Sequence, residues 1–238
     1  MKDKLYDFYI LHQRKYKESS LLVSIFTSEF GKISGVIRTN KKQQNLYQPL
    51  VKLCGQISLA RRDSGLNKIY NIEFIESFYK KSYINLLALQ YINELIFLLL
   101  SYSDEDDTLF KKYDFVMSNM SEDNYKYLLR FFELELLESL GQGVYVEHDL
   151  DGYNIEPAKN YNILFAGFRE AVVAGANSVK GLSLMKIREP LYKWTEQDLK
   201  VIARVTRLKL DNILVGKQLQ SRKLLLDYLS LKRRAVIC

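Results

Sequence analysis

Apolar residues in the first third of the chain recur in short runs separated by polar turns. The runs lie at residues 5–11, 21–26, 32–38, 50–59 and 67–76. Thr-Ser-Glu-Phe-Gly at 27–31 is the clearest hairpin turn, because glycine readily adopts the positive φ that such turns need. Five short strands at this spacing predict a small closed β-barrel.

Alternation within the last of these runs divides its side chains between two faces of the strand. It places Ile69 and Ile75 on one face of the strand, together with Asn71. Ile72 and Phe74 then lie on the opposite face.

From residue 83 onward the apolar period changes from two toward 3.6, which indicates helices. Residues 83–101 are strongly apolar, lack Gly and Pro, and predict a core helix. The four acids at 104–107 end it and favour the start of a following helix. A further helical stripe spans 125–136, and Ser121 is its predicted N-cap.

The last third of the chain begins irregularly and ends in helices. Residues 142–180 predict loops with a small hairpin, and Thr195 with Asp198 forms a capping box that opens a helix. A final helix is predicted over 217–231. The fold class is therefore α+β, with a β-barrel domain at 1–80 and a mainly α-helical domain at 81–238. An irregular, cysteine-free insert occupies about 142–180 of the helical domain.

Composition places the chain among globular intracellular proteins. Hydrophobic residues make up 47% of its 238 residues and charged residues 26%. The two cysteines, Cys54 and Cys238, argue against a disulfide framework and favour the cytoplasm. The N-terminus carries acids where a signal peptide has none, and the apolar run 95–100 is too short for a membrane span. We therefore expect a soluble protein with no membrane partner.

Charge is segregated along the sequence, which is more informative than the total of +7. Residues 1–82 carry a net charge of +8, residues 83–170 carry −10, and residues 171–238 carry +9. Basic ends around an acidic middle indicate that two separate surfaces meet anionic partners. The alternative is an ordinary solvated surface, which accounts for many charge blocks.

Motifs for catalysis and cofactor binding are nearly absent. Gly-Gln-Gly at 141–143 is half of a dinucleotide loop and follows a helix instead of a strand, and no P-loop motif occurs. His12 and His148 stand in no zinc-protease motif, and the glycine near His148 falls too early for a calcium loop. We expect a protein that is not an enzyme, with no catalytic residue, metal or cofactor.

The acidic loop at 104–107 is the exception that could support metal chemistry. Its carboxylates could hold two divalent ions, as nucleases do. Consecutive residues on one loop rarely converge on a metal, so a solvated helix cap is favoured. A metal-dependent nuclease that uses Asp104 and Asp106 is the enzyme alternative.

Basic residues gather at the turns and strand ends of the predicted barrel. On an oligonucleotide-binding barrel such positions follow a sugar–phosphate backbone, so binding should be independent of base sequence and strongly salt-dependent. Tyr16, Tyr47 and Tyr70 are either platforms for base stacking or packing residues of the barrel. The candidate DNA-binding residues are Arg14, Lys15, Lys17, Lys32, Arg38, Lys41, Lys42, Arg61, Arg62 and Lys68.

A set of short segments spread over the chain carries a family resemblance. They lie at residues 11–14, 18–22, 26–36, 47–50, 91–95, 130–137, 140–143 and 216–222. The most extended are Phe-Thr-Ser-Glu-Phe-Gly-Lys-Ile-Ser-Gly-Val at 26–36 and Arg-Phe-Phe-Glu-Leu-Glu-Leu-Leu at 130–137. In this order the segments resemble the bacterial recombination mediator family RecO.

The resemblance implies an N-terminal OB-fold and a helical C-terminal domain, in agreement with the apolar pattern. It also implies a mediator of DNA repair and homologous recombination in the RecFOR pathway. Such a protein binds single- and double-stranded DNA, anneals complementary strands, and acts with RecR to load the recombinase RecA onto strands coated by SSB. A cytoplasmic, nucleoid-associated location follows.

The family also binds the acidic, hydrophobic-ended tail of SSB on its helical domain. Such a tail needs cations for its carboxylates and an apolar pocket for its last aromatic ring. The matching candidates are Arg130, Lys186, Arg204 and Arg207. For each of them, a surface ion pair with the acidic middle of the chain is the alternative role.

One feature departs from the family pattern. Many relatives place a four-cysteine zinc site after the Leu-Gly-x-Gly segment, whereas residues 144–156 contain no cysteine here. Two cysteines in the whole chain cannot build that site, so we expect a zinc-less member whose insert is held by packing. The alternative is a general OB-fold protein that binds nucleic acid, RNA included, without a mediator role. A preference for ligands with a 2′-OH would favour it.

Overall fold

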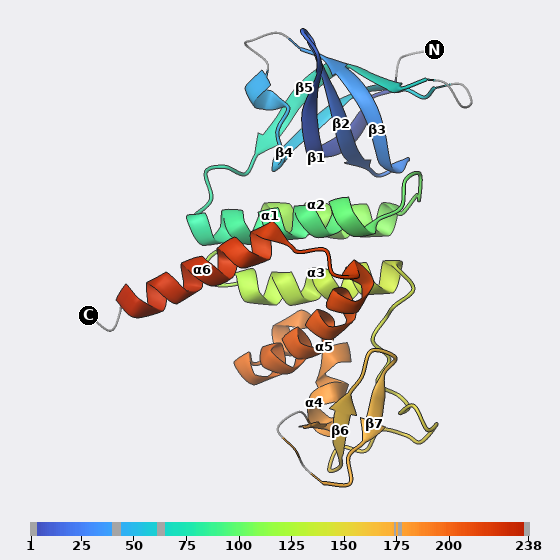
Figure 1. Ribbon diagram of the computed structural model, residues 1–238, viewed down its shortest axis with the longest axis vertical. Coiled ribbons are helices and arrows are strands. Elements are labelled where there is room, and N and C mark those ends of the chain that lie inside the picture. Colours follow the sequence, from blue (N-terminus) through green and yellow to red (C-terminus); the bar gives the residue numbers. More distant parts are fainter. Residues whose placement is uncertain (1–3, 40–43, 61–64, 174, 176–177, 236–238) are drawn as a thin grey trace. The chain divides into compact units, whose positions relative to one another are not determined.

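The computed structural model describes residues 4–39, 44–60, 65–173, 175 and 178–235 (Figure 1). The chain forms two compact units. The barrel unit comprises residues 1–122 and 219–238, and the helical unit comprises residues 123–218. The end of the chain therefore returns to the unit in which the chain begins.

The barrel unit is built on five strands that close on themselves. Their order is β1-β2-β3-β5-β4, and every neighbouring pair is antiparallel except the parallel pair β3 and β5. The predicted closed barrel, with the connectivity of an OB-fold, is thus confirmed, and the fold class is α+β. The strands are β1 (Tyr6–Lys17), β2 (Ser20–Thr27), β3 (Gly31–Arg38), β4 (Val51–Ser58) and β5 (Asn67–Ser77).

The predicted hairpin turn joins β2 to β3 and is held by its own side chains. The Thr27 hydroxyl accepts a hydrogen bond from the Phe30 amide at 2.9 Å and donates one to the Gly31 carbonyl at 3.2 Å. Gly31 has φ +59°, and a Cβ there would lie 1.9 Å from the Asp104 carbonyl oxygen. The turn therefore needs glycine, and its geometry sets the β2–β3 register.

A β-bulge in β5 changes which of its side chains point into the barrel. The β4–β5 register shifts between Cys54 and Gln56, and Asn71 adopts φ +50° opposite this break. The Asn71 amide donates to the Gln56 side-chain oxygen at 2.7 Å. As a result both Ile69 and Ile72 pack on the barrel core, so the prediction of opposite faces was wrong.

Three helices belong to the barrel unit: α1 (Tyr83–Leu99), α2 (Asp107–Asn119) and α6 (Gln220–Ala235). Asp114 of α2 accepts a hydrogen bond from the buried Tyr9 hydroxyl at 2.5 Å and pairs with Lys52 at 2.7 Å. Glu94 of α1 accepts from the first amides of α6, those of Gln220 and Ser221, at 3.0 and 2.9 Å. The last barrel strand ends at Ser77, close to the domain boundary predicted near residue 80. However, α1, α2 and α6 belong to the same compact unit as the barrel, and the second unit starts at residue 123.

The helical unit contains α3 (Tyr125–Ser139), a short α4 (Gly181–Met185) and α5 (Glu196–Leu214). The capping box of Thr195 and Asp198 is confirmed at the start of α5, while Asn124, and not Ser121, stands at the N-cap of α3. In the described part of the chain no helix combines the length and the apolar character needed to cross a bilayer.

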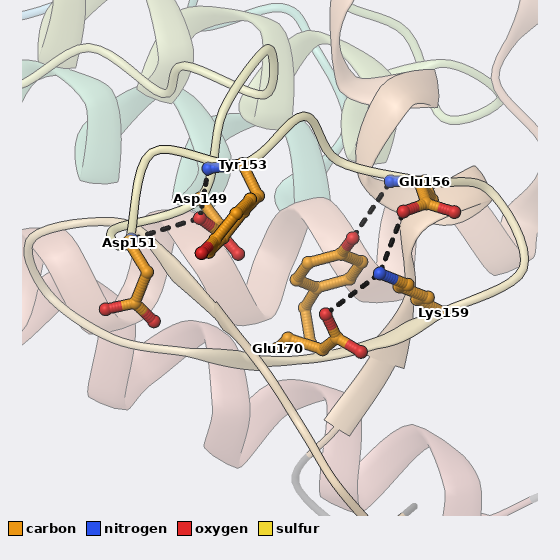
Figure 2. A network of polar contacts seen from close by, with 7 residues as sticks. Asp149, Asp151, Tyr153, Glu156, Lys159 and Glu170 are labelled. Carbon is orange, nitrogen blue, oxygen red and sulfur yellow. Dashed lines mark hydrogen bonds and ion pairs between the residues drawn. The ribbon is translucent and has the colours of Figure 1, made fainter.

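The insert folds into more than the hairpin expected for it. Strands β6 (Asn160–Ile163), β7 (Phe168–Glu170) and β8 (Ser178–Lys180) form a three-stranded sheet in the order β7-β6-β8. Residues between α3 and β6 form loops, and Figure 2 shows the polar contacts that hold them.

Two side chains, the buried Asp149 and the partly exposed Lys159, organise these loops. The buried Asp149 carboxylate accepts from the backbone amides of Asp151 and Tyr153 at 3.0 and 2.9 Å (Figure 2). Further along, the Lys159 ammonium bridges Glu156 at 2.8 Å and Glu170 at 3.1 Å. Among the described residues no group of three or more potential ligands could hold a metal ion. The hydrogen bonds of Asp149 and the ion pairs of Lys159 supply cross-links here.

Substituting Asp149 tests this account of the insert. Asp149→Ala leaves the Asp151 and Tyr153 amides without their carboxylate acceptor, a cost of roughly 1–3 kcal/mol, and should raise hydrogen exchange of the peptide covering residues 147–156. Asp149→Asn keeps an acceptor oxygen and should exchange far more slowly than the alanine variant. Excess EDTA should leave the thermal midpoint of the wild-type protein unchanged. Equal exchange in both variants, or a lower midpoint in EDTA, would contradict the account.

Candidate nucleic-acid interface

The strand register of the barrel brings three of the predicted cationic positions to one place. Lys17 pairs with Ser20 at the β1–β2 turn, and Ser20 pairs with Arg38 at the end of β3. On the other side of β3, Val36 pairs with Lys68 at the start of β5. Residues that are far apart in the sequence therefore lie at the same end of the barrel.

These positions surround a surface pocket of about 960 Å³. Among the described residues, three cationic side chains and no carboxylate line this pocket. Its lining therefore carries a net positive charge. Its apolar floor comes from Val36, Leu66, Ile69 and Ile72, which can accept the flat face of a ring. The full lining, which we call the barrel-end pocket, is Tyr16, Lys17, Ser20, Val36, Arg38, Tyr47, Leu66, Lys68, Ile69, Tyr70, Asn71 and Ile72.

The three candidate stacking residues differ in their exposure. Tyr16 is 47% exposed and Tyr70 is 46% exposed, and both line the barrel-end pocket. The Lys17 ammonium lies 5.5 Å from the centroid of the Tyr16 ring, so charge and aromatic surface are presented together. Tyr47 is 4% exposed, and burial raises the pKa of its phenol. Tyr47 is therefore a core residue, whereas Tyr16 and Tyr70 are free to contact a base.

Other predicted DNA contacts lie apart from the pocket lining. Arg14 and Lys15 are exposed on β1, two residues and one residue before Tyr16. Lys41, Lys42, Arg61 and Arg62 fall outside the described residues.

Lys32 was predicted to contact DNA, but its side chain is buried and not available to a ligand. Its side chain starts at the opposite end of β3 from Arg38 and is 4% exposed. Its ammonium donates to the Phe97 carbonyl at 2.9 Å and lies 4.6 Å from the centroid of the Tyr102 ring. Lys32 thus fastens the end of α1 to the barrel and is not part of the candidate interface.

Helix α5 carries a second cationic site, in the helical unit. Lys200, Arg204 and Arg207 follow one another at spacings of four and three residues, so they share one helix face. A pocket of about 460 Å³ adjoins this face, with Lys180, Lys200 and Arg204 around Val179 and Val201. No carboxylate lines the described pocket, which we call the α5 pocket.

Sequence reasoning missed two of the cations of the α5 pocket. Lys200 could have been found, because it precedes Arg204 by one helical turn. Lys180 could not, since it reaches the pocket only through the fold of the small sheet, whose strand β8 ends at that residue.

Of the four predicted tail-binding residues only Arg204 lines the α5 pocket, while Arg207 shares its helix face and Arg130 and Lys186 lie elsewhere in the unit. The Arg130 guanidinium pairs at 3.0 Å with Glu133, whose carboxylate is buried and also accepts from the Thr206 hydroxyl. Only 19% of the Arg130 side chain is exposed, so its charge mainly compensates a buried acid. Lys186 is half-buried, and its carbonyl oxygen accepts from the Trp194 indole at 3.0 Å.

The acidic loop at 104–107 serves as a helix start. Asp106 caps α2 by accepting from the Leu109 amide at 2.8 Å, and Asp107 pairs with Lys111 one turn later. These contacts account for two of its four carboxylates. Among the described residues no group of three or more His, Cys, Asp or Glu side chains could hold a metal ion.

Comparisons with known proteins agree along the whole chain. The family model described as Recombination protein O N terminal matches residues 1–78, and Recombination protein O C terminal matches residues 80–223. The DNA repair protein RecO of Francisella tularensis subsp. novicida is 64% identical, over 97% of this chain and 99% of its own length. That of Francisella philomiragia is 63% identical over the same shares, and that of Vibrio vulnificus is 32% identical over 94% of each chain.

Removing the three charges of the barrel-end pocket should weaken binding to DNA and reduce its dependence on salt. With Lys17→Gln, Arg38→Gln and Lys68→Gln combined, the slope of log K against log salt should fall by up to about 2 for a single strand, roughly 0.7 per lost phosphate contact. Fluorescence anisotropy with labelled oligothymidylate at several salt concentrations measures it. Lys111→Gln, an exposed lysine of the same unit on α2, is the matched control. An unchanged slope in the triple variant would rule out this pocket as a phosphate-binding site.

Proposed function

Because the chain belongs to the recombination protein O (RecO) family, we propose that it is a DNA repair and recombination mediator. In this role it binds single- and double-stranded DNA, anneals complementary strands, and helps load RecA onto SSB-coated single strands together with RecR. The observation that carries the proposal is the barrel-end pocket, where three cations and two exposed tyrosines meet without a carboxylate.

The chemistry of the barrel-end pocket suits binding that is independent of base sequence. Lys17, Arg38 and Lys68 supply charge to phosphates but no fixed pattern of donors and acceptors that would read base edges. Tyr16 and Tyr70 offer rings on which any base can stack. A protein that meets two complementary strands in this way neutralises their mutual repulsion and leaves the pairing edges of the bases open.

The same arrangement explains why no catalytic group is needed. Annealing releases free energy by itself once the repulsion between two phosphate backbones is reduced. The protein then acts as a binding platform, and bond breaking plays no part in the proposed function. A general nucleic-acid-binding role without mediation uses the same pocket, and a preference for RNA over DNA in competition would favour it.

The α5 pocket is the proposed site for the SSB tail. Lys200, Arg204 and the neighbouring Arg207 supply cations for the aspartates and the terminal carboxylate of such a tail. Val179 and Val201 provide an apolar wall for its last aromatic ring. Arg130 and Lys186 stand in the same unit but outside this lining, so the proposed site does not include them. RecR and, through it, RecA are proposed partners on the strength of the family alone.

Annealing in the presence of SSB tests the mediator role. Two complementary oligonucleotides with a fluorescent donor and acceptor are coated with SSB, and energy transfer reports the duplex. The wild-type protein should accelerate annealing, and the triple variant at Lys17, Arg38 and Lys68 should be slower by about tenfold or more. Lys111→Gln should match the wild type. If the wild-type protein does not accelerate annealing at all, the proposed function is wrong.

Charge reversal on α5 separates tail binding from DNA binding. Arg204→Glu with Arg207→Glu should weaken binding of a synthetic SSB-tail peptide by about tenfold or more, because both positions then repel its carboxylates. Affinity for naked oligothymidylate should change less than about twofold. Lys217→Glu, an exposed cation of the same unit outside the pocket, is the control. Equal losses for peptide and DNA would refute the division of roles.

A further inference from the structure

A third pocket, in the helical unit, has the opposite character to the two described above. It is a groove of about 440 Å³ between one face of α3 and the segment that leads from α4 to α5. We call it the α3 groove. Its lining is Phe131, Leu134, Glu135, Glu138, Val144, Ile187, Arg188, Glu189, Pro190, Leu191 and Trp194.

The floor of the α3 groove is apolar and firmly held. Trp194, Ile187 and Val144 are each at most 6% exposed, and the half-buried Phe131 and Leu134 complete it from the side of α3. The Trp194 indole donates to the Lys186 carbonyl at 3.0 Å, which fixes the plane of the ring. A preformed apolar floor of this kind can take an aliphatic or aromatic side chain without reorganising.

The charge on the α3 wall of the groove is negative. Glu135 and Glu138 stand one helical turn apart on the face that also carries Phe131 and Leu134. Glu138 keeps a contact of 3.4 Å with the Tyr145 hydroxyl and is otherwise open to solvent. The residues of α3 that line the groove include no lysine or arginine.

The opposite wall adds one cation and one carboxylate to the lining. The Arg188 guanidinium lies 5.4 Å from the centroid of the Tyr145 ring, and Glu189 pairs at 2.9 Å with Lys193, so the two carboxylates of α3 leave the lining with an excess of negative charge. The barrel-end and α5 pockets, in contrast, have cations and no carboxylate in their described linings. In a chain of net charge +7, the α3 groove therefore selects for ligands of the opposite sign to those of the other two pockets.

We propose that the α3 groove docks a cationic segment of a partner protein, one that carries a leucine or phenylalanine next to arginine or lysine. The apolar side chain fills the floor over Trp194, and the cations contact Glu135 and Glu138. Nucleic acid and acidic tails are repelled by the same carboxylates. The groove thus gives the protein a third docking site, whose lining shares no residue with the other two, and the inference holds whether or not the proposed function is correct.

The single tryptophan of the chain makes this proposal directly measurable, because it lies in the groove. The probes are a small panel of capped heptapeptides, each with a central leucine–phenylalanine pair and three flanking arginines or lysines in different spacings. Titration into the full-length protein should shift the Trp194 emission, with a Kd below about 100 µM for at least one peptide. The same peptides with glutamate in place of every cation should not bind.

Matched variants locate the binding. Glu135→Gln with Glu138→Gln preserves shape and should weaken the best peptide by about tenfold or more, whereas Glu196→Gln, an exposed acid on α5, should not. Leu134→Ala, checked for folding by circular dichroism, should also weaken it. DNA and SSB-tail affinities should be unchanged in the glutamine variants. No binding by any cationic peptide, equal binding by the glutamate peptides, or an unchanged Kd in the double variant would overturn the proposal.

Discussion

The contact that closes the barrel between β3 and β5 is the constraint on which the candidate interface depends. It spans three residue pairs, and glycine at position 35 permits it, since a Cβ there would lie 3.1 Å from the Asn67 carbonyl oxygen. Asn67 then fastens the junction through its side-chain amide, which donates to the Ser34 carbonyl at 2.8 Å. Because of this closure Lys68 reaches the pocket that Arg38 also lines, although the two come from separate strands. Without it the cations would be spread along an open sheet, and no acid-free pocket would form.

Segregation of charge along the sequence becomes segregation of charged pockets in the structure. The first basic block contributes the barrel-end pocket, and the last contributes most of the α5 pocket. The acidic residues of the middle block have two roles. Asp106 caps α2, and Asp114 holds α2 to the barrel, whereas Glu135 and Glu138 line the α3 groove. Surfaces of opposite sign on one chain allow partners of opposite sign to bind without displacing one another.

Local patterns were enough to predict most of the secondary structure, whereas contacts between distant segments were not predictable. The hairpin turn at 27–31 follows from a threonine and a glycine at fixed spacing, and both act within the turn itself. Lys32 looked like a DNA contact, but a loop from after α1 and the Phe97 carbonyl bury it. The bulge at Asn71 reverses the alternation of β5 because a side-chain bond to Gln56 supports a positive φ. Lys180 joins its pocket only once the small sheet has formed.

Locating a bound base gives the most direct test of the central claim that nucleic acid binds at the barrel-end pocket. Oligothymidylate carrying 5-iodouracil can be irradiated in complex with the full-length protein, and the cross-linked peptide identified by mass spectrometry. The account predicts cross-links at Tyr16 or Tyr70, the two exposed rings of the barrel-end pocket. Cross-links confined to the helical unit, or to the barrel end near Lys32, would contradict it.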